Sequence, residues 1–191
     1  MCVVMEIDRV NPEIFGVNIR EWPVEAAESR LFLGQDPSGN RLAIKVYPNL
    51  TIRQIQTYAE VTNQLAGLVN GSGVTVTLEV QGNANSYSVY ITPISILGVV
   101  ADPDQSDRDI PCTISPFIDG ETLFDLDRRY LSGQWSFSTS QNSLKVLSLG
   151  LKRVSGRQGI SIISWNVKPL EIEDQPILVV TDVCGSIKSL R

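Results

Sequence analysis

The residue types available for chemistry are restricted, because the 191-residue chain contains no histidine. Ser-His-Asp and Cys-His nucleophilic sites are therefore excluded, and so is general-base catalysis by imidazole. Any acid–base chemistry must use carboxylates, lysine, tyrosine or bound water.

The cysteines and the acidic stretch of the chain do not form a metal-binding pattern. The three cysteines, Cys2, Cys112 and Cys184, are far apart and include no Cys-x-x-Cys pair. A tetrahedral zinc site would need all three thiols and a carboxylate, so we predict buried, inert thiols instead. Residues 101–109 are rich in aspartate but lack the spacing and the glycine of an EF-hand, and we interpret them as a solvated loop.

Composition and charge narrow the classes of partner. The net charge is −5 and the basic residues are scattered, so we expect neither nucleic-acid binding nor membrane binding. An apolar fraction of 42% is enough for one core and argues against intrinsic disorder. No apolar run approaches the roughly 18–20 residues that span a bilayer, and residues 1–10 carry no positive leader. We expect a single compact unit in the cytoplasm.

The elements that would position functional side chains begin with an irregular, extended start over residues 1–28. A Thr-x-x-Gln capping box at Thr51 and Gln54 then opens a predicted helix over 51–68. Further helices are predicted over 122–131 and 138–154. Strands are predicted over 30–35, 41–47, 74–80, 86–94, 110–118, 160–163, 167–172 and 176–181.

The order of these elements favours an α+β class over a doubly wound sheet, because strands and helices do not alternate regularly. Apolar positions in the elements predict the core. They are Leu31, Leu33, Leu42, Ile44, Val46, Ile55, Leu65, Val76, Leu78, Ile91, Ile114, Phe117, Leu144, Leu147, Ile177 and Val179.

A resemblance to protein kinases begins in the strand Leu42-Ala43-Ile44-Lys45-Val46, which is similar to the Val-Ala-Ile-Lys strand of that family. The helix that follows places Glu60 fifteen residues beyond Lys45. The resemblance implies that Lys45 neutralises the α- and β-phosphates of ATP and that Glu60 holds this lysine in place.

Three more segments follow in the order of the family. Residues 114–123, which include Phe117, resemble the strand and hinge that join the two kinase lobes. Asn166 resembles the asparagine of the catalytic loop, and Asp182 resembles the aspartate of Asp-Phe-Gly, with one residue too many before Gly185. The resemblance implies a nucleotide site of Lys45, Glu60, Phe117, Asn166 and Asp182, in which Asn166 and Asp182 bind Mg²⁺.

The sequence departs from the family where catalysis is concerned. The His-Arg-Asp triplet is missing, and the position of its aspartate is occupied by Ser161, which cannot accept a proton at neutral pH as a carboxylate can. Residues 20–31 contain no glycine and three glutamates, so the glycine-rich loop over the phosphates is missing. The activation segment and most of a helical second lobe are also missing up to Arg191.

We therefore expect a protein-kinase-like α+β fold, with an N-lobe-like sheet and helix over 1–118 and a reduced C-lobe-like part over 119–191. The predicted function is that of a pseudokinase with a regulatory or scaffold role, with ATP and Mg²⁺ as candidate ligands and no catalytic residue. A weakly active ATP-dependent phosphotransferase and an interaction domain unrelated to kinases are the alternatives. Apolar surface left exposed by a reduced second lobe predicts a protein partner or self-association.

Overall fold

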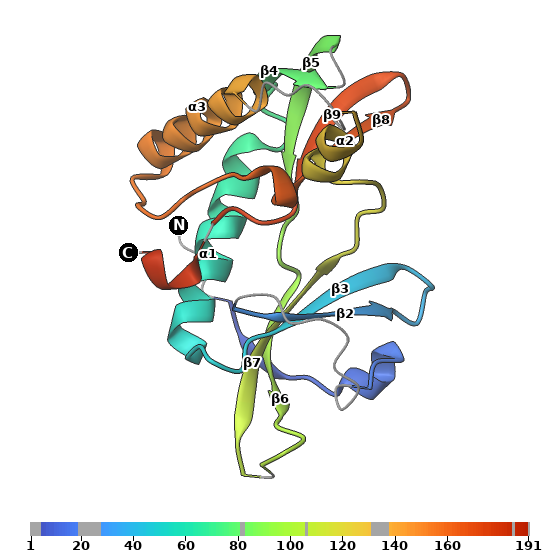
Figure 1. Cartoon of the computed structure of the whole chain (residues 1–191). Helices are drawn as coiled ribbons and strands as arrows, with labels where there is room; N and C mark the ends of the chain where they lie inside the picture. The colour runs from blue at the N-terminus through green and yellow to red at the C-terminus, as the bar shows by residue number, and fades with distance from the viewer. Residues whose placement is uncertain are drawn as a thin grey trace. The chain divides into compact units, whose positions relative to one another are not determined.

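The chain forms two compact units built from two β-sheets and three α-helices, among the residues that the structure describes (Figure 1). The structure is a computed structural model that describes residues 5–18, 28–80, 83–105, 107–130, 138–184 and 186–190. The first unit comprises residues 1–63 and 93–118, and the second comprises 64–92 and 119–191. The α+β class predicted from the sequence is confirmed.

The first unit contains a five-stranded sheet in the order β1-β6-β7-β3-β2. Its strands are β1 (Ile7–Arg9), β2 (Arg30–Gln35), β3 (Arg41–Val46), β6 (Ile96–Ala101) and β7 (Asp109–Pro116). β1 runs parallel to β6, and the other neighbours are antiparallel. Strand β6 was not predicted. The expected extended start at residues 14–17 is wrong, because Pro12–Phe15 form the 3-10 helix η1, which Asn11 caps.

One face of this sheet carries a hydrophobic core. Phe32, Ile44, Val46, Cys112 and Ile114 are buried in it. The prediction that Leu31 and Leu33 belong to the core is wrong, since they are 38% and 52% exposed. Successive side chains of a strand point to opposite faces, and β2 turns Phe32, not its two leucine neighbours, toward the core.

Helix α1 (Ile52–Val69) confirms the helix predicted over 51–68. The capping box is formed, because the Gln54 side chain accepts from the Thr51 N–H at 2.9 Å and the Thr51 hydroxyl accepts from the Gln54 N–H at 3.4 Å. In the first unit, Asn63 bonds both backbone groups of Ile94, at 2.8 and 2.9 Å. In the second unit, Asn70 does the same to Ile91, also at 2.8 and 2.9 Å.

The second unit contains a four-stranded sheet in the order β4-β5-β9-β8. Its strands are β4 (Thr75–Val80), β5 (Asn83–Ile91), β8 (Val167–Ile172) and β9 (Gln175–Val180). β5 pairs in parallel with β9, and the other two pairings are antiparallel. This pairing places residues 64–92 in the second unit, whereas the sequence prediction grouped them with residues 1–118.

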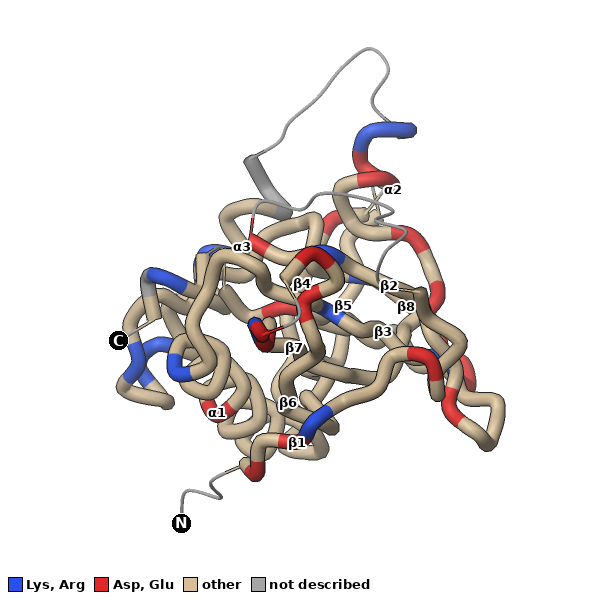
Figure 2. The backbone as a smooth tube through the Cα atoms, turned by 90° about the horizontal axis from the view of Figure 1, so that it is seen from below, with Lys and Arg blue, Asp and Glu red and all other residues tan. Residues whose placement is uncertain are grey.

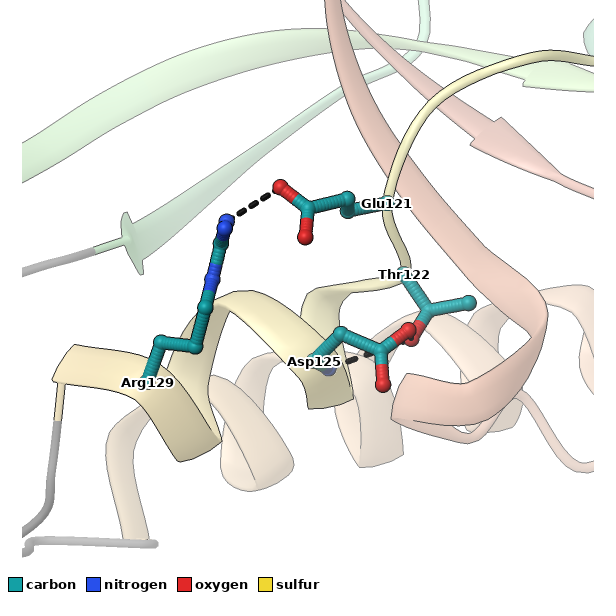
Figure 3. Close-up of polar contacts among 4 residues, drawn as sticks. All are labelled: Glu121, Thr122, Asp125 and Arg129. Atoms are coloured by element: carbon teal, nitrogen blue, oxygen red, sulfur yellow. Dashed lines mark hydrogen bonds and ion pairs between the residues drawn. The ribbon is translucent and has the colours of Figure 1, made fainter.

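Two further helices belong to the second unit and confirm the helices predicted over 122–131 and 138–154. Helix α2 (Leu123–Tyr130) is capped by Thr122, whose hydroxyl accepts from the Asp125 N–H at 3.1 Å. An ion pair joins Arg129, in the last turn of this helix, to Glu121, which precedes it (Figure 3). Helix α3 (Ser138–Ser155) packs against β4.

Both cysteines in the described part of the chain are buried free thiols, as predicted; Cys2 lies outside that part. Burial raises the pKa of the Cys112 thiol to about 12, so that it stays protonated and inert at neutral pH.

Acidic and basic positions are interspersed along the backbone (Figure 2). Among the described helices, none combines the length and the apolar character required to cross a membrane.

Candidate functional site

Asn166 and Asp182 lie at the same end of the β8–β9 hairpin, one before β8 and the other after β9. Val167, the first residue of β8, is paired with Val180, the last residue of β9. Beyond this pair, the Thr181 N–H donates to the Asn166 carbonyl at 2.8 Å, and the Thr181 hydroxyl donates to the same oxygen at 3.2 Å. The antiparallel pairing thus places Asn166 beside Thr181, the residue before Asp182, although Asn166 and Asp182 are sixteen positions apart in the sequence.

Local hydrogen bonds fix the backbone at both residues. Asn166 ends a short 3-10 helix, η2 (Ser164–Asn166), and its N–H donates to the Ile163 carbonyl at 2.9 Å. The Asp182 carboxylate accepts from the Cys184 N–H at 3.1 Å, which is the Asx-turn geometry typical of aspartate. Both side chains are half-buried. They are therefore held in a defined place at the rim of the second sheet.

Ser161 lies beside the same corner. Its N–H donates to the Val183 carbonyl at 3.0 Å, and its neighbour Ile160 forms an isolated antiparallel bridge with Cys184. The strand predicted over 160–163 is thus reduced to a single bridge at Ile160. The segment 160–166 contains no carboxylate. We call Ser161, Asn166 and Asp182 the hairpin-end site.

The ligand atoms of the hairpin-end site suit magnesium. Amide and carboxylate oxygens are the donors that Mg²⁺ takes, and this ion keeps several waters and needs only one or two protein ligands when a phosphate supplies others. Asn166 and Asp182 provide such a pair. Among the described residues, no group of three or more His, Cys, Asp or Glu could hold a metal. A divalent ion at Asn166 and Asp182 would therefore depend on oxygens from a ligand or from water.

Lys45 lies in the first unit, on the sheet face opposite the hydrophobic core. Its direct partner across the β3–β7 ladder is Thr113, so both side chains lie on one face. The Thr113 hydroxyl lies 3.2 Å from that of Tyr47, whose ring packs edge-to-face on Tyr58 of α1 at 6.5 Å. Lys45 is half-buried on the face that α1 covers.

Glu60 is also half-buried, but it follows Tyr58 by two positions on α1. At 3.6 residues per turn, two positions correspond to a rotation of about 200°, so Glu60 and Tyr58 project from opposite sides of the helix. Tyr58, not Glu60, thus occupies the side of α1 that contacts the sheet face of Lys45. The ion pair between Lys45 and Glu60 stays a prediction.

Phe117 follows β7, as expected for the predicted hinge segment. Its N–H donates to the Arg41 carbonyl at 3.0 Å, which extends the β3–β7 ladder by one residue. The Arg41 guanidinium lies 4.4 Å from the centre of the Phe117 ring, within the range of a cation–π contact. Because this N–H is used by the sheet, adenine would have to pair with other backbone groups of the segment.

Sequence reasoning missed Ser148, which connects α3 to the segment that carries Ser161. The Ser148 hydroxyl donates to the Leu144 carbonyl at 2.7 Å and accepts from the Ile162 N–H at 2.8 Å. Ser148 is only 7% exposed. The sequence contained a signal for the burial of Ser148, because this serine lies four positions after Leu144 and three before Leu151, on the apolar stripe of the helix.

Comparison with known proteins finds similarity at the level of backbone structure only. No protein-family model matches the chain, and no curated protein matches it. A co-crystal structure of the pseudokinase DRIK1 (drought responsive inactive kinase 1) bound to ENMD-2076 is similar, with 9% sequence identity and a TM-score of 0.48 over 93% of this chain. An apo pseudokinase structure is similar with 11% identity and a TM-score of 0.48 over 95% of this chain. The chain spans 62% and 60% of these two structures.

Proposed function

We propose that this chain is a kinase-like module of the pseudokinase type, which binds a nucleotide with Mg²⁺ weakly and acts as a regulatory or scaffold protein. The observation that supports the proposal is that Asn166 pairs through its backbone with Thr181, so that Asp182 follows at the same end of the β8–β9 hairpin. Asn166 and Asp182 are the two residues that the sequence motifs assign to magnesium. Because they are sixteen positions apart in the sequence, the folding of the hairpin is needed to bring them to the same end.

Within this proposal, the Asn166 amide and the Asp182 carboxylate hold the divalent ion. The ion, when bound, neutralises charge on the phosphates of the nucleotide. The phosphate-binding role of Lys45, which lies in the first unit, stays a prediction of its strand motif. The predicted role of Glu60 in holding Lys45 stays a prediction of the same motif.

The proposal excludes efficient phosphoryl transfer because of Ser161. This serine lies at the backbone of Val183, one residue after Asp182, where the kinase pattern requires a carboxylate. A serine hydroxyl cannot accept the proton of an attacking hydroxyl at neutral pH. Positioning and charge neutralisation still provide much of phosphoryl-transfer catalysis, so a weak phosphotransferase is the second candidate.

Thermal unfolding with and without nucleotide tests the binding step. A ligand at ten times its dissociation constant stabilises the folded state by about 1.4 kcal/mol, which is a rise of about 3–6 °C in Tm for a chain of this size. We expect millimolar MgATP or MgADP to give such a rise. Asp182→Asn should abolish most of it, because the amide removes the negative charge that attracts the cation.

A matched control comes from the opposite end of the same hairpin. Asp174 is exposed in the β8–β9 turn with a φ of 60°, a conformation that asparagine tolerates well. Asp174→Asn should leave the rise in Tm unchanged. If the wild-type chain shows no rise with any nucleotide and Mg²⁺, or if both variants reduce it equally, the proposed nucleotide site is wrong.

Turnover separates the two candidate functions. For a pseudokinase, wild-type ATP hydrolysis should equal the uncatalysed background, and Ser161→Asp should raise it, since a positioned general base contributes about 10²–10⁴-fold. For a weak phosphotransferase, the wild type should show hydrolysis above background that Asp182→Asn removes. Wild-type turnover of that kind would overturn the pseudokinase assignment while leaving nucleotide binding intact.

A further inference from the structure

A groove in the second unit lies between α3 and the segment that precedes Asn166. Its volume is about 570 Å³, within the range of about 300–1,000 Å³ that ligand sites occupy. Leu144, Ile160 and Ile162 line it and are almost completely buried. Leu149 and Trp165 also line it but are 54% and 57% exposed. The groove thus has a packed apolar base and large apolar side chains left in contact with solvent.

The charge of this groove is opposite to that of the chain. Its described lining residues include Lys145 and Lys152 and no carboxylate. Helix α3 as a whole contains these lysines and Arg153, and it contains no aspartate or glutamate. The complete chain, in contrast, has a net charge of −5. The two lysines of this apolar groove would attract an acidic ligand.

We propose that this groove, which we call the α3 groove, binds an acidic segment of a partner protein that inserts an apolar side chain between two carboxylates. The lysines are seven positions apart on the helix, and Leu149 lies four positions after the first and three before the second. All three therefore share one face, with the lysine backbones about 10.5 Å apart along the axis. An extended peptide covers about 10 Å in three residues, which sets the spacing of its two carboxylates.

Other occupants fit the groove less well. A symmetric dimer formed through α3 would bring the lysines of both copies together, and like charges in close contact are unfavourable. A bilayer accepts a convex apolar face, whereas Leu149 and Trp165 line a hollow that an inserted side chain can fill. An acidic peptide satisfies the charge and the shape at once, and tryptophan is a residue type enriched at binding hot spots.

The α3 groove also shares an element with the hairpin-end site. Trp165 lies in the 3-10 helix Ser164–Asn166, directly before Asn166, and Ser161 belongs to both places. A partner seated on Trp165 would therefore contact the element that positions Asn166. This inference goes beyond the proposed nucleotide binding and does not require it, since no nucleotide enters the binding experiment.

Selection from a random twelve-residue peptide display library, with the full chain as the bait, tests the proposal. We expect the enriched peptides to carry aspartate or glutamate three positions apart with an apolar residue between them. An enriched peptide labelled with fluorescein should bind the wild-type chain in an anisotropy titration, and higher salt should weaken binding because exposed charges are screened.

Neighbouring residues of α3 supply matched controls. Lys152 lines the groove and Arg153 does not, so Lys152→Glu should weaken peptide binding at least about tenfold while Arg153→Glu changes it less than about threefold. In the same way, Leu149 lines the groove and Val146, which is 69% exposed, does not. Leu149→Ser should abolish binding and Val146→Ser should preserve it.

Three outcomes would overturn the proposal. The first is the enrichment of basic or uncharged peptides. The second is an equal loss of binding in Lys152→Glu and Arg153→Glu. The third is another occupant, shown by self-association in sedimentation that Lys152→Glu disrupts, or by binding of phosphatidylcholine vesicles containing phosphatidylserine that Leu149→Ser abolishes. The thermal shift with MgATP is read independently, so failure of the α3 groove is distinguishable from failure of the nucleotide site.

Discussion

Helices α1 and α3 have the same length and opposite surroundings. Each is 18 residues long. Along α1, the single large apolar side chain that is exposed is Leu68, at 43%. Among the described side chains of α3, Val146, Leu149 and Val154 are 69%, 54% and 66% exposed. Two helices of equal length thus differ in how much of their large apolar side chains the fold buries.

The long polar side chains of the two helices also differ. Asn63 on α1 and Asn70, directly after its last residue, use their amides to satisfy the backbone of Ile94 and Ile91, each within its own unit. On α3, Lys145 lines the α3 groove, and it is exposed. The comparison indicates that α1 is committed to the stability of the fold, whereas one face of α3 is available for a ligand.

The largest expected difference between the helices comes from truncating one leucine in each. Leu65 on α1 is completely buried, so Leu65→Ala should reduce the free energy of unfolding by about 2–5 kcal/mol through lost apolar burial and a cavity. Leu149 on α3 is 54% exposed, so Leu149→Ala should change it by no more than about 0.5 kcal/mol. Urea unfolding measures both. Equal losses would show that Leu149 is covered in the folded protein and would end the comparison.

A second, smaller difference is expected for asparagine. Asn63→Asp keeps an acceptor for the Ile94 N–H but replaces the donor that faces the Ile94 carbonyl with a carboxylate oxygen. The loss of this bond should cost about 1–3 kcal/mol of unfolding free energy at pH 7.

Asn142, an exposed residue of α3, provides the matched substitution. Asn142→Asp should alter stability by less than about 0.5 kcal/mol, since no tertiary hydrogen bond of α3 depends on it in the described part of the chain. Unfolding of both variants by urea at pH 7 decides the matter. A neutral effect of Asn63→Asp would mean that the amide clamp on Ile94 contributes nothing to stability.

The helices themselves were predictable from the sequence, because their signals are local. The Thr51–Gln54 capping box and the stripe of Leu144, Leu147 and Leu151 lie within a few residues of each other, and the structure places both helices within one residue of the predicted bounds. The exposure of Leu31 and Leu33 was not predictable in this way. It depends on which face of β2 meets the core, and this is fixed by pairing with β3.

The candidate site was predictable only in part for the same physical reason. Asn166 and Asp182 were chosen by motif, but their proximity depends on the register of β8 with β9, which the sequence does not encode locally. Glu60 was chosen by its distance along the chain from Lys45. The direction in which it projects depends on the rotation of α1 about its axis, and the contact of Tyr58 with Tyr47 sets that rotation. The α3 groove arises from burial and lining, which become visible only in the folded chain.

The smallest expected effect is a change in the free energy of unfolding that should be equal for the two helices. Each has one interior glycine, Gly67 on α1 and Gly150 on α3, and at both positions an added Cβ would meet no atom within 4 Å. Alanine is favoured over glycine in a helix by about 0.5–1 kcal/mol, mainly because glycine loses more backbone entropy. Gly67→Ala and Gly150→Ala should therefore each raise the free energy of unfolding by that amount, as measured in urea. Gly150 does not line the α3 groove, so Gly150→Ala should also bind the selected peptide as the wild type does. A loss of stability in either variant would reveal a close neighbour at that helix surface, and for α3 it would mean that the exposed face is already occupied within the folded chain.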